Sequence, residues 1–224
     1  MRLYMGDASV PALAECRQRA PAHSYGRVWT PDLRRYGSPY IVDNGEYQAA
    51  QQGREWCADE WRSVLDVAAN QPFPPDFAVL PDVYNDAEAT LARHREYIDE
   101  VRDRGLRPAA VLQPGMAADT QVRLADQIGA RVVFVGGANR WKRAVGEDIV
   151  TEAHNRGLAV HIGNPGLPGG LEWAQGIGVD SVDTSTIVAN QAYHHLDELG
   201  GLSKGSRKKG GKQVALGQEV PSDD

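Results

Sequence analysis

Short apolar runs recur along the 224 residues of this chain, and their spacing constrains the fold more than any other feature. The later runs are separated by segments with helical patterning, and a glycine precedes several of them. Strand, helix and glycine repeated about every 25 residues favour successive βαβ units and a parallel sheet. The eight predicted strands are residues 2–5, 23–29, 40–43, 77–80, 109–113, 132–135, 158–162 and 181–185.

Helical periodicity is clearest in residues 86–104, where apolar residues fall near one face and charged residues near the others. Asp86 is a good N-cap for this helix, and Gly105 is a good residue to end it. Further helices are predicted over residues 119–128, 141–155 and 171–175.

Eight strands favour closure of residues 1–199 into a compact (β/α)8 TIM-type barrel of the α/β class. A doubly wound open sheet is the alternative. The glycine-rich fingerprints of its nucleotide-binding forms do not occur in the sequence. No apolar stretch approaches the roughly 20 residues of a membrane span, and the N-terminus lacks a signal-peptide core, so we expect a cytoplasmic protein.

Charge is distributed unevenly along the chain, which has a formal net charge of -6. Residues 200–224 are rich in Gly, Ser, Lys and Gln, and they are predicted to form a flexible basic and polar tail. Such a tail either binds phosphates through counterion release or is simply a solvated terminus. Its cationic residues are Lys204, Arg207, Lys208, Lys209 and Lys212.

Three of the apolar runs end in an aspartate, namely Asp43, Asp82 and Asp183. Because the carboxyl ends of barrel strands face the same end, these acids should surround one opening together with other strand-end residues. Two such carboxylates can act as nucleophile and general acid or base on a sugar, and a third can accept the N–H groups of a base edge. Acid clusters also bind divalent metals, and each Asp could instead cap the next helix. The other strand-end residues are Gln113, Gly136, Gly137 and His161.

Two of these segments resemble motifs of one enzyme family. Residues 41–48, Ile-Val-Asp-Asn-Gly-Glu-Tyr-Gln, resemble the Asp-Ser-Gly-Gly-Phe-Gln segment of tRNA-guanine transglycosylases, and residues 178–183 resemble their Gly-(Val/Ile)-Asp-Met-Phe-Asp nucleophile segment. The Gly-Gly pair at 136–137 followed by Trp141-Lys142 is similar to the phage and bacterial branch, the DpdA-type 7-deazaguanine DNA transglycosylases. The resemblance spans most of residues 1–199.

The resemblance implies a glycosyltransferase that exchanges guanine in DNA for a 7-deazaguanine base such as preQ0. Asp183 would be the nucleophile that forms a covalent glycosyl-enzyme, and Asp43 would assist by proton transfer. Asp82 would hold the guanine edge, with Gln113, Gly136 and Gly137 completing base recognition. Members of the family often form dimers, so a homodimer is possible.

Nucleic-acid contacts are expected just after the Gly-Gly turn. Arg140, Trp141, Lys142 and Arg143 supply a stacking surface and cations for phosphate, although Trp141 could instead pack in its helix. His161 either lines the pocket or is a core histidine whose hydrogen bonds are satisfied.

The sequence also departs from the transglycosylase pattern. It lacks the Cys-x-Cys-x-x-Cys zinc site of the tRNA enzymes, so no zinc or other cofactor is expected and DNA is favoured over tRNA. Cys16 and Cys57 lie too far apart in sequence for a Cys-x-x-Cys site, and we expect both to be reduced thiols. Glu46 adds a carboxylate that either raises the pKa of Asp43 by like-charge repulsion or points to solvent.

Three alternatives to a DNA transglycosylase remain open at this stage. One is a tRNA-guanine transglycosylase-like enzyme, or queuine tRNA-ribosyltransferase. Another is a metal-dependent barrel that acts on a small sugar or phosphate through Asp43, Asp82, His161 and Asp183. The last is a non-catalytic barrel that binds nucleic acid through its tail and residues 140–143.

Overall fold

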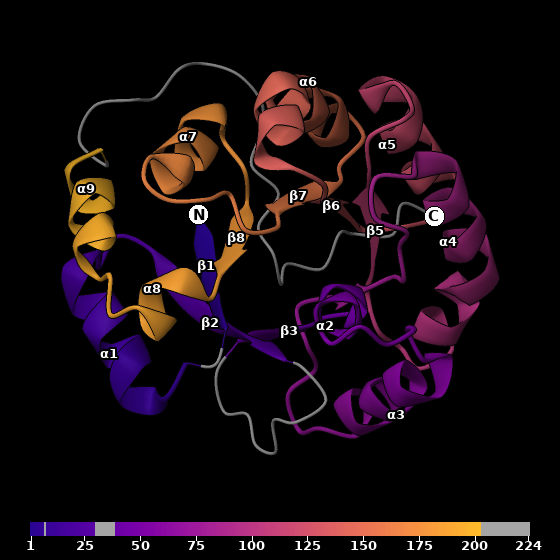
Figure 1. Ribbon diagram of the computed structural model, residues 1–224, viewed down its shortest axis with the longest axis horizontal. Coiled ribbons are helices and arrows are strands. Elements are labelled where there is room, and N and C mark those ends of the chain that lie inside the picture. The colour runs from indigo at the N-terminus through magenta and orange to yellow at the C-terminus, as the bar shows by residue number, and fades with distance from the viewer. Residues whose placement is uncertain (7, 30–38, 203–224) are drawn as a thin grey trace, which may run out of the picture.

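The protein is a closed barrel of eight parallel strands surrounded by helices (Figure 1). The computed structural model describes residues 1–6, 8–29 and 39–202. The barrel closes because β1 pairs with both β2 and β8, with Leu3 opposite Tyr25 on one side and opposite Val182 on the other. The predicted TIM-type barrel is therefore confirmed, and the open doubly wound sheet was wrong.

Strands and helices alternate along most of the chain. The strands are β1 (Arg2–Gly6), β2 (Ser24–Trp29), β3 (Tyr40–Val42), β4 (Ala78–Val79), β5 (Pro108–Leu112), β6 (Val132–Val135), β7 (Ala159–Ile162) and β8 (Ser181–Thr184). The helices are α1 (Val10–Arg19), α2 (Glu46–Gln51), α3 (Ala58–Ala69), α4 (Ala87–Arg102), α5 (Ala118–Gln127), α6 (Asn139–Asn155), α7 (Gly170–Ile177), α8 (Thr186–Ala189) and α9 (His194–Leu202).

Each of the eight predicted strands overlaps an observed one, and the four predicted helices correspond to α4, α5, α6 and α7. The Asp86 side chain accepts a hydrogen bond from the backbone N–H of Ala89, so its predicted role as N-cap is confirmed. The sequence analysis did not predict α1, α2, α3, α8 or α9. A usable signal was present for α3, because Trp61, Val64, Leu65 and Ala68 fall at helical spacing and are all buried.

Two apolar cores lie on the two faces of the sheet. Successive side chains of a strand point to opposite faces, so Tyr4 of β1 enters the barrel while Leu3 and Met5 pack toward the surrounding helices. The barrel interior is filled by apolar side chains, and the largest of these are Tyr4 and Phe77. At the amino-terminal end, the Tyr4 hydroxyl donates a hydrogen bond of 2.6 Å to Asp76. The barrel is therefore a packed core rather than a channel.

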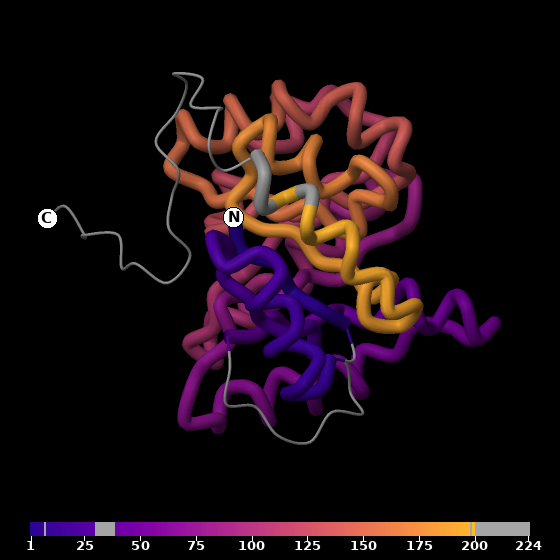
Figure 2. Tube along the Cα trace, turned by 90° about the vertical axis from the view of Figure 1, so that its left-hand side faces the viewer, coloured from indigo at the N-terminus to yellow at the C-terminus, as the bar shows by residue number. Residues whose placement is uncertain are grey.

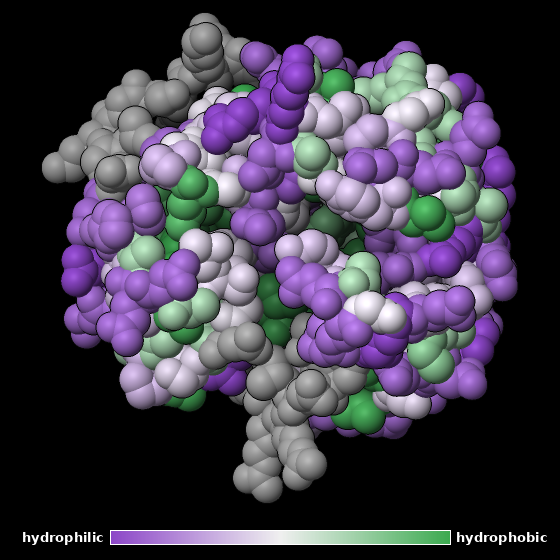
Figure 3. Space-filling model, in the orientation of Figure 1, coloured by the Kyte–Doolittle hydropathy of each residue, from purple (hydrophilic) through white to green (hydrophobic). Residues whose placement is uncertain are grey.

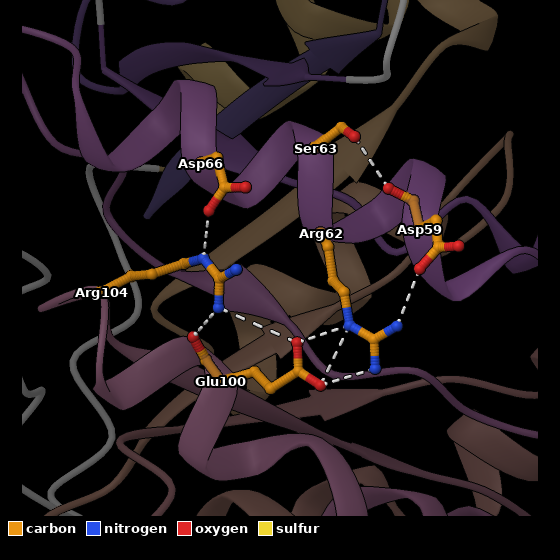
Figure 4. A network of polar contacts seen from close by, with 6 residues as sticks. All are labelled: Asp59, Arg62, Ser63, Asp66, Glu100 and Arg104. Carbon is orange, nitrogen blue, oxygen red and sulfur yellow. Dashed lines mark hydrogen bonds and ion pairs between the residues drawn. The ribbon is translucent and has the colours of Figure 1, made fainter.

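Helices α3 and α4 are joined by a network of charged side chains (Figure 4). The Arg62 guanidinium donates to both carboxylate oxygens of Glu100 and also to Asp59. Arg104 donates to Asp66 at 2.6 Å and to the backbone carbonyl of Glu100 at 2.7 Å. Bidentate arginine–carboxylate pairs are geometrically specific, so this network fixes how α3 sits against α4.

The last helix packs against the first, and an ion pair of 3.0 Å joins Arg19 of α1 to Asp197 of α9. In the side view, the indigo start of the chain and the yellow α9 lie next to each other (Figure 2). Polar side chains dominate the face seen in the space-filling view, with apolar ones scattered among them (Figure 3). Among the described residues, no helix combines the length and apolar character needed to cross a bilayer. Residues 200–202 of the predicted tail belong to α9, and its remaining residues, 203–224, lie outside the described residues.

Candidate active site

The sequence-predicted site residues lie at the carboxyl ends of the strands, here called the mouth of the barrel. Asp43 directly follows β3, Gln113 follows β5, and Gly136 follows β6. His161 and Asp183 are the next-to-last residues of β7 and β8. The parallel strands therefore gather these residues at one end, as expected for a TIM-type barrel.

Asp183 is paired with His161. Nε2 of His161 lies 2.9 Å from Oδ1 of Asp183, and Nδ1 lies 2.9 Å from Oγ of Ser181. A carboxylate only accepts hydrogen bonds, so a neutral imidazole with its proton on Nε2 satisfies both contacts when the Ser181 hydroxyl donates to Nδ1. The backbone N–H of Asn164 also donates to Asp183 Oδ1, at 3.2 Å. One oxygen of Asp183 is thus held by two donors.

An aromatic layer of the barrel interior supports His161, which is fully buried. The Phe134 ring stacks on the imidazole with 4.6 Å between ring centroids, and Phe77 and Tyr4 contact it at 5.3 and 5.9 Å. Gly163 allows this packing, because a Cβ there would come within 2.6 Å of Phe134. His161 therefore follows the alternative of a core histidine with both nitrogens bonded, and it also contacts the candidate catalytic carboxylate.

The carboxyl group of Asp43 has a raised pKa. Burial raises the pKa of Asp43 to about 7, and the negative charges of Asp183 and Asp82 add to the shift. Its own pKa therefore allows Asp43 to exchange a proton near neutral pH. Glu46 does not contribute, because it forms an ion pair with Arg93, which also donates to the backbone carbonyl of Asp82. Both interpretations of Glu46 from the sequence were wrong.

Asp82 is buried and both of its oxygens accept hydrogen bonds from side-chain amides. Asn44 donates to Oδ1 at 2.7 Å, and Gln113 donates to Oδ2 at 2.6 Å. Burial raises the pKa of Asp82, while these two hydrogen bonds act in the opposite direction. Gly136 leaves room for Gln113, because a Cβ at that position would lie 2.7 Å from Nε2 of Gln113. Asp82, Asn44 and Gln113 thus form a buried polar wall.

Lys142 lies inside the protein rather than on a nucleic-acid surface. Its ammonium donates to the backbone carbonyls of Gly163 and Asn164, the latter at 3.1 Å. Burial lowers the pKa of Lys142 to about 8, and the nearby charge of Asp183 offsets part of that effect. Lys142 therefore stabilises the loop that donates a hydrogen bond to Asp183, and its predicted role in phosphate contact was wrong.

The other residues of the predicted nucleic-acid surface are not brought together. Arg140 is exposed, and Trp141 is half-buried and packs against the outer core. The guanidinium of Arg143 lies 5.0 Å from the centre of the Trp173 ring. Trp141 thus follows the packing alternative given for it, and residues 140–143 do not form one continuous stacking and cationic surface.

Two of the candidate metal ligands at the mouth, Asp82 and His161, are already engaged with protein partners. In the described part of the chain, no three His, Cys, Asp or Glu side chains are grouped so that they could hold a metal ion. Asp82 is bonded through both oxygens, and His161 through both nitrogens. The metal-dependent alternative therefore lacks a preformed ligand set among these residues.

Sequence reasoning missed several residues that shape the site. Asn44 lies in the motif-like segment 41–48 but was given no role, yet it donates to Asp82 and its carbonyl accepts from Trp56 at 2.8 Å. Phe134 and Ser181 orient His161 and were not singled out. Period-two alternation offered a signal for Ser181, because it lies two residues before Asp183 on the same face of β8.

The sequence matches no family model and no curated protein. Solved structures with a similar barrel include 3-hexulose-6-phosphate synthase from Salmonella typhimurium, with a TM-score of 0.48 and 13% identity over 90% of this chain and 98% of that one. A 2,3-dimethylmalate lyase of the PEP mutase/isocitrate lyase superfamily has a TM-score of 0.48 and 12% identity over 93% and 86%. The YdjI aldolase from Escherichia coli K12 has a TM-score of 0.45 and 10% identity over 88% and 87%.

None of these three neighbours is named as a transglycosylase. Since no family model or curated protein supports it either, the predicted membership of the tRNA-guanine transglycosylase superfamily is withdrawn. The predicted glycosyltransferase activity, on DNA or on tRNA, is corrected with it. DNA and a preQ0-like base are therefore withdrawn as predicted partners. The alternative of a non-catalytic barrel that binds nucleic acid is withdrawn as well. The possible homodimer stays a prediction.

Proposed function

We propose that this protein is an enzyme that transfers protons on a small hydroxylated or carbonyl-bearing molecule, such as a short sugar, bound at the barrel mouth. The observation that carries the proposal is the contrast between Asp43 and Asp183. Burial raises the pKa of Asp43 to about 7, whereas two hydrogen-bond donors hold Asp183. Two carboxyl groups in contrasting environments are the usual arrangement for one acid and one base.

The two groups divide the chemistry as follows. Asp183 accepts a proton from the carbon next to the substrate carbonyl, using the oxygen that His161 and Asn164 do not occupy. Protonated Asp43 donates to the carbonyl oxygen, so the product of this step is a neutral enediol or enol. Return of that proton from Asp183 to the former carbonyl carbon, while ionised Asp43 takes the proton of the neighbouring hydroxyl, would complete an isomerase reaction.

The proposed reaction needs no bound metal, because protonated Asp43 itself neutralises the charge that develops on the carbonyl oxygen. We expect treatment with EDTA to leave the activity unchanged. A cytoplasmic setting also remains our proposal, and the free thiols of Cys16 and Cys57 are consistent with a reducing compartment.

Proton exchange with solvent tests the function without knowledge of the natural substrate. The protein is incubated in D2O with dihydroxyacetone, glyceraldehyde, hydroxyacetone, fructose and their phosphate esters, and loss of the C–H signal next to the carbonyl is followed by proton NMR. We expect exchange with at least one compound, slowed on the order of 100-fold or more in Asp183→Asn and in Asp43→Asn.

The matched control is Asp148→Asn, which makes the same change at an exposed aspartate of α6. It should exchange at the wild-type rate. Absence of exchange by the wild type with every compound would overturn the proposal, and so would equal rates in the wild type and in Asp183→Asn.

A further inference from the structure

Two apolar side chains lie at the mouth of the barrel with the proposed acid and base. Val28 is the next-to-last residue of β2, and Phe134 is the next-to-last residue of β6. His161 and Asp183 hold the same position in β7 and β8. Val28 and Phe134 pack against the core inside the barrel, so they lie on the inner face of the sheet. They therefore occupy the same end of the barrel interior as the two carboxyl groups.

The exposure of Val28 and Phe134 distinguishes them from the rest of the inner core. Within the described residues 1–6, 8–29 and 39–202, they are the two apolar side chains packed against that core that are only partly buried. The core residues themselves are 3% exposed or less. An inward side chain can meet solvent only through an end of a closed barrel, and these two lie near the carboxyl end. Val28 and Phe134 are here called the floor of the mouth.

The floor lies beside the proposed acid and base. Val28 pairs in register with the β3 residue two positions before Asp43, on the same face of the sheet. A Cβ at Gly163 would lie 2.6 Å from the Phe134 ring and 3.5 Å from Oδ1 of Asp183, so the ring and the carboxylate border the same point. Asp43 and Asp183 are themselves partly exposed. A molecule bound between the two carboxyl groups therefore meets apolar carbon beneath it.

An apolar floor distinguishes between carbon substituents and hydroxyl groups of a ligand. The side chains of Val28 and Phe134 carry no hydrogen-bond donor or acceptor, and His161 beneath the Phe134 ring is bonded through both nitrogens. A hydroxyl group placed against the floor would lose its hydrogen bonds to water without replacing them, which is unfavourable. A methyl or methylene group has no such bonds to lose and gains from burial.

We propose that Val28 and Phe134 contact the substrate and restrict it to carbonyl compounds with a methyl or methylene group, rather than a hydroxymethyl group, on the side of the carbonyl away from the reacting carbon. The inference rests on the proposed function, because it concerns the molecule that reacts between Asp43 and Asp183. It predicts that the protein prefers hydroxyacetone to dihydroxyacetone, which differ by one hydroxyl group.

The test compares binding of these two compounds to the full-length protein with carbon-13-labelled valine methyl groups, followed by NMR. The Val28 signals are identified by their loss in Val28→Thr. We expect them to shift in a saturable manner with hydroxyacetone. The dissociation constant should be at least about fivefold larger for dihydroxyacetone, which corresponds to about 1 kcal/mol. The signals of Val145, a partly exposed valine of α6 on the outer side of the barrel, should not shift.

Val28→Thr tests the floor directly, because it replaces one methyl group by a hydroxyl group with almost the same shape. The threonine hydroxyl can pair with the additional hydroxyl of dihydroxyacetone, so the preference for hydroxyacetone should disappear. Val145→Thr makes the same substitution outside the barrel and should keep the wild-type ratio of dissociation constants. Two ligands are compared within each folded variant, so a change in stability alone does not alter the ratio.

Three results would overturn the proposal. The Val28 signals shift with neither compound, the wild type binds dihydroxyacetone as tightly as hydroxyacetone, or folded Val28→Thr keeps the wild-type ratio. The first two need only the wild-type protein, so they decide the matter even if Val28→Thr does not fold. Binding is measured without turnover. Solvent exchange without the preference would therefore overturn this inference alone, and the preference without solvent exchange would overturn only the proposed function.

Discussion

Nε2 of His161 lies 2.9 Å from Oδ1 of Asp183, across two adjacent strands. The register of β7 and β8 pairs His161 with Ser181, and Asp183 lies two residues farther along the same face. One histidine can therefore accept from Ser181 and donate to Asp183 at the same time. The orientation of the proposed base is thus built into the sheet rather than into a loop.

Replacing Ser181 with alanine should disturb this pair. Nδ1 of His161 would lose its hydrogen-bond partner while remaining buried, so we expect a loss of about 1 kcal/mol in unfolding free energy. The imidazole nitrogen-15 shifts should also report a changed tautomer balance. Thr184→Val is the control, because the buried Thr184 hydroxyl has no partner among the described residues and its removal should cost little. Equal losses of unfolding free energy in both variants would contradict the role of Ser181 as the donor to His161.

Asp43→Asn should stabilise the protein at neutral and alkaline pH. The folded-state pKa of Asp43 is raised from 3.8 to about 7, so folding favours the protonated acid and stability falls as pH rises from about 4 to 7. The asparagine variant escapes this loss, and we expect a gain on the order of 2 kcal/mol at pH 8. Urea unfolding at pH 4 and pH 8 measures it. If the difference in unfolding free energy between the variant and the wild type is the same at pH 4 and pH 8, the pKa assignment is refuted. Asp148→Asn is the control.

Gln113→Leu should destabilise the protein by roughly 1–3 kcal/mol, because Asp82 loses the donor to its Oδ2. The hydrogen bond favours ionised Asp82, whose pKa is raised by burial. The loss should therefore be larger at pH 8 than at pH 4. Gln175→Leu is the matched control, since Oε1 of Gln175 is buried without a described partner. A loss independent of pH would show that Gln113 acts through packing alone.

Lys142→Met should destabilise the loop that contacts Asp183, because two backbone carbonyls lose their donor. We expect unfolding free energy to fall by about 1–3 kcal/mol at pH 7. The lysine pKa is lowered from 10.5 to about 8, so wild-type stability should rise from pH 8 to 10.5 relative to the methionine variant. Arg140→Met, on an exposed position of the same helix, should change neither quantity.

Glu100→Gln should show the opposite pH dependence to Asp43→Asn. Hydrogen bonds from Arg62 lower the pKa of Glu100, so its contribution is present above the unfolded-state pKa of 4.5 and is lost as pH falls through the lower folded value. Because the network lies at the surface, we expect at most about 1 kcal/mol, and less in 1 M NaCl. Glu147→Gln is the exposed control on α6. An effect that persists at pH 2 would point to packing instead.

The order of the strands followed from the sequence because βαβ units are local. Each strand, its helix and the next strand lie within a few tens of residues, and parallel strands joined in this way cross over with one hand. Asp43, Gln113 and Asp183 could be placed at one end of the barrel for the same reason. Helices α1 and α2 were not predicted, because α2 has only 6 residues and α1 buries only Leu13 and Cys16, which leaves little apolar periodicity to read.

The partners of the polar side chains were beyond the reach of sequence reasoning. Asp183 and His161 are 22 residues apart, and Glu46 and Arg93 are 47 apart. Lys142 looked like a surface cation, yet the turn after β6 directs its ammonium to the carbonyls of the next loop. The motif resemblance led to the wrong enzyme family, because strand-end aspartates are a consequence of barrel geometry and serve unrelated chemistries.

The sequence by itself determined the barrel and the end at which its polar residues gather, because both depend on periodicity and on the direction of the strands. Only the tertiary structure decided which carboxyl group has a raised pKa and which is held by hydrogen-bond donors. Those properties arise from burial and from contacts between distant residues, and no local pattern encodes them.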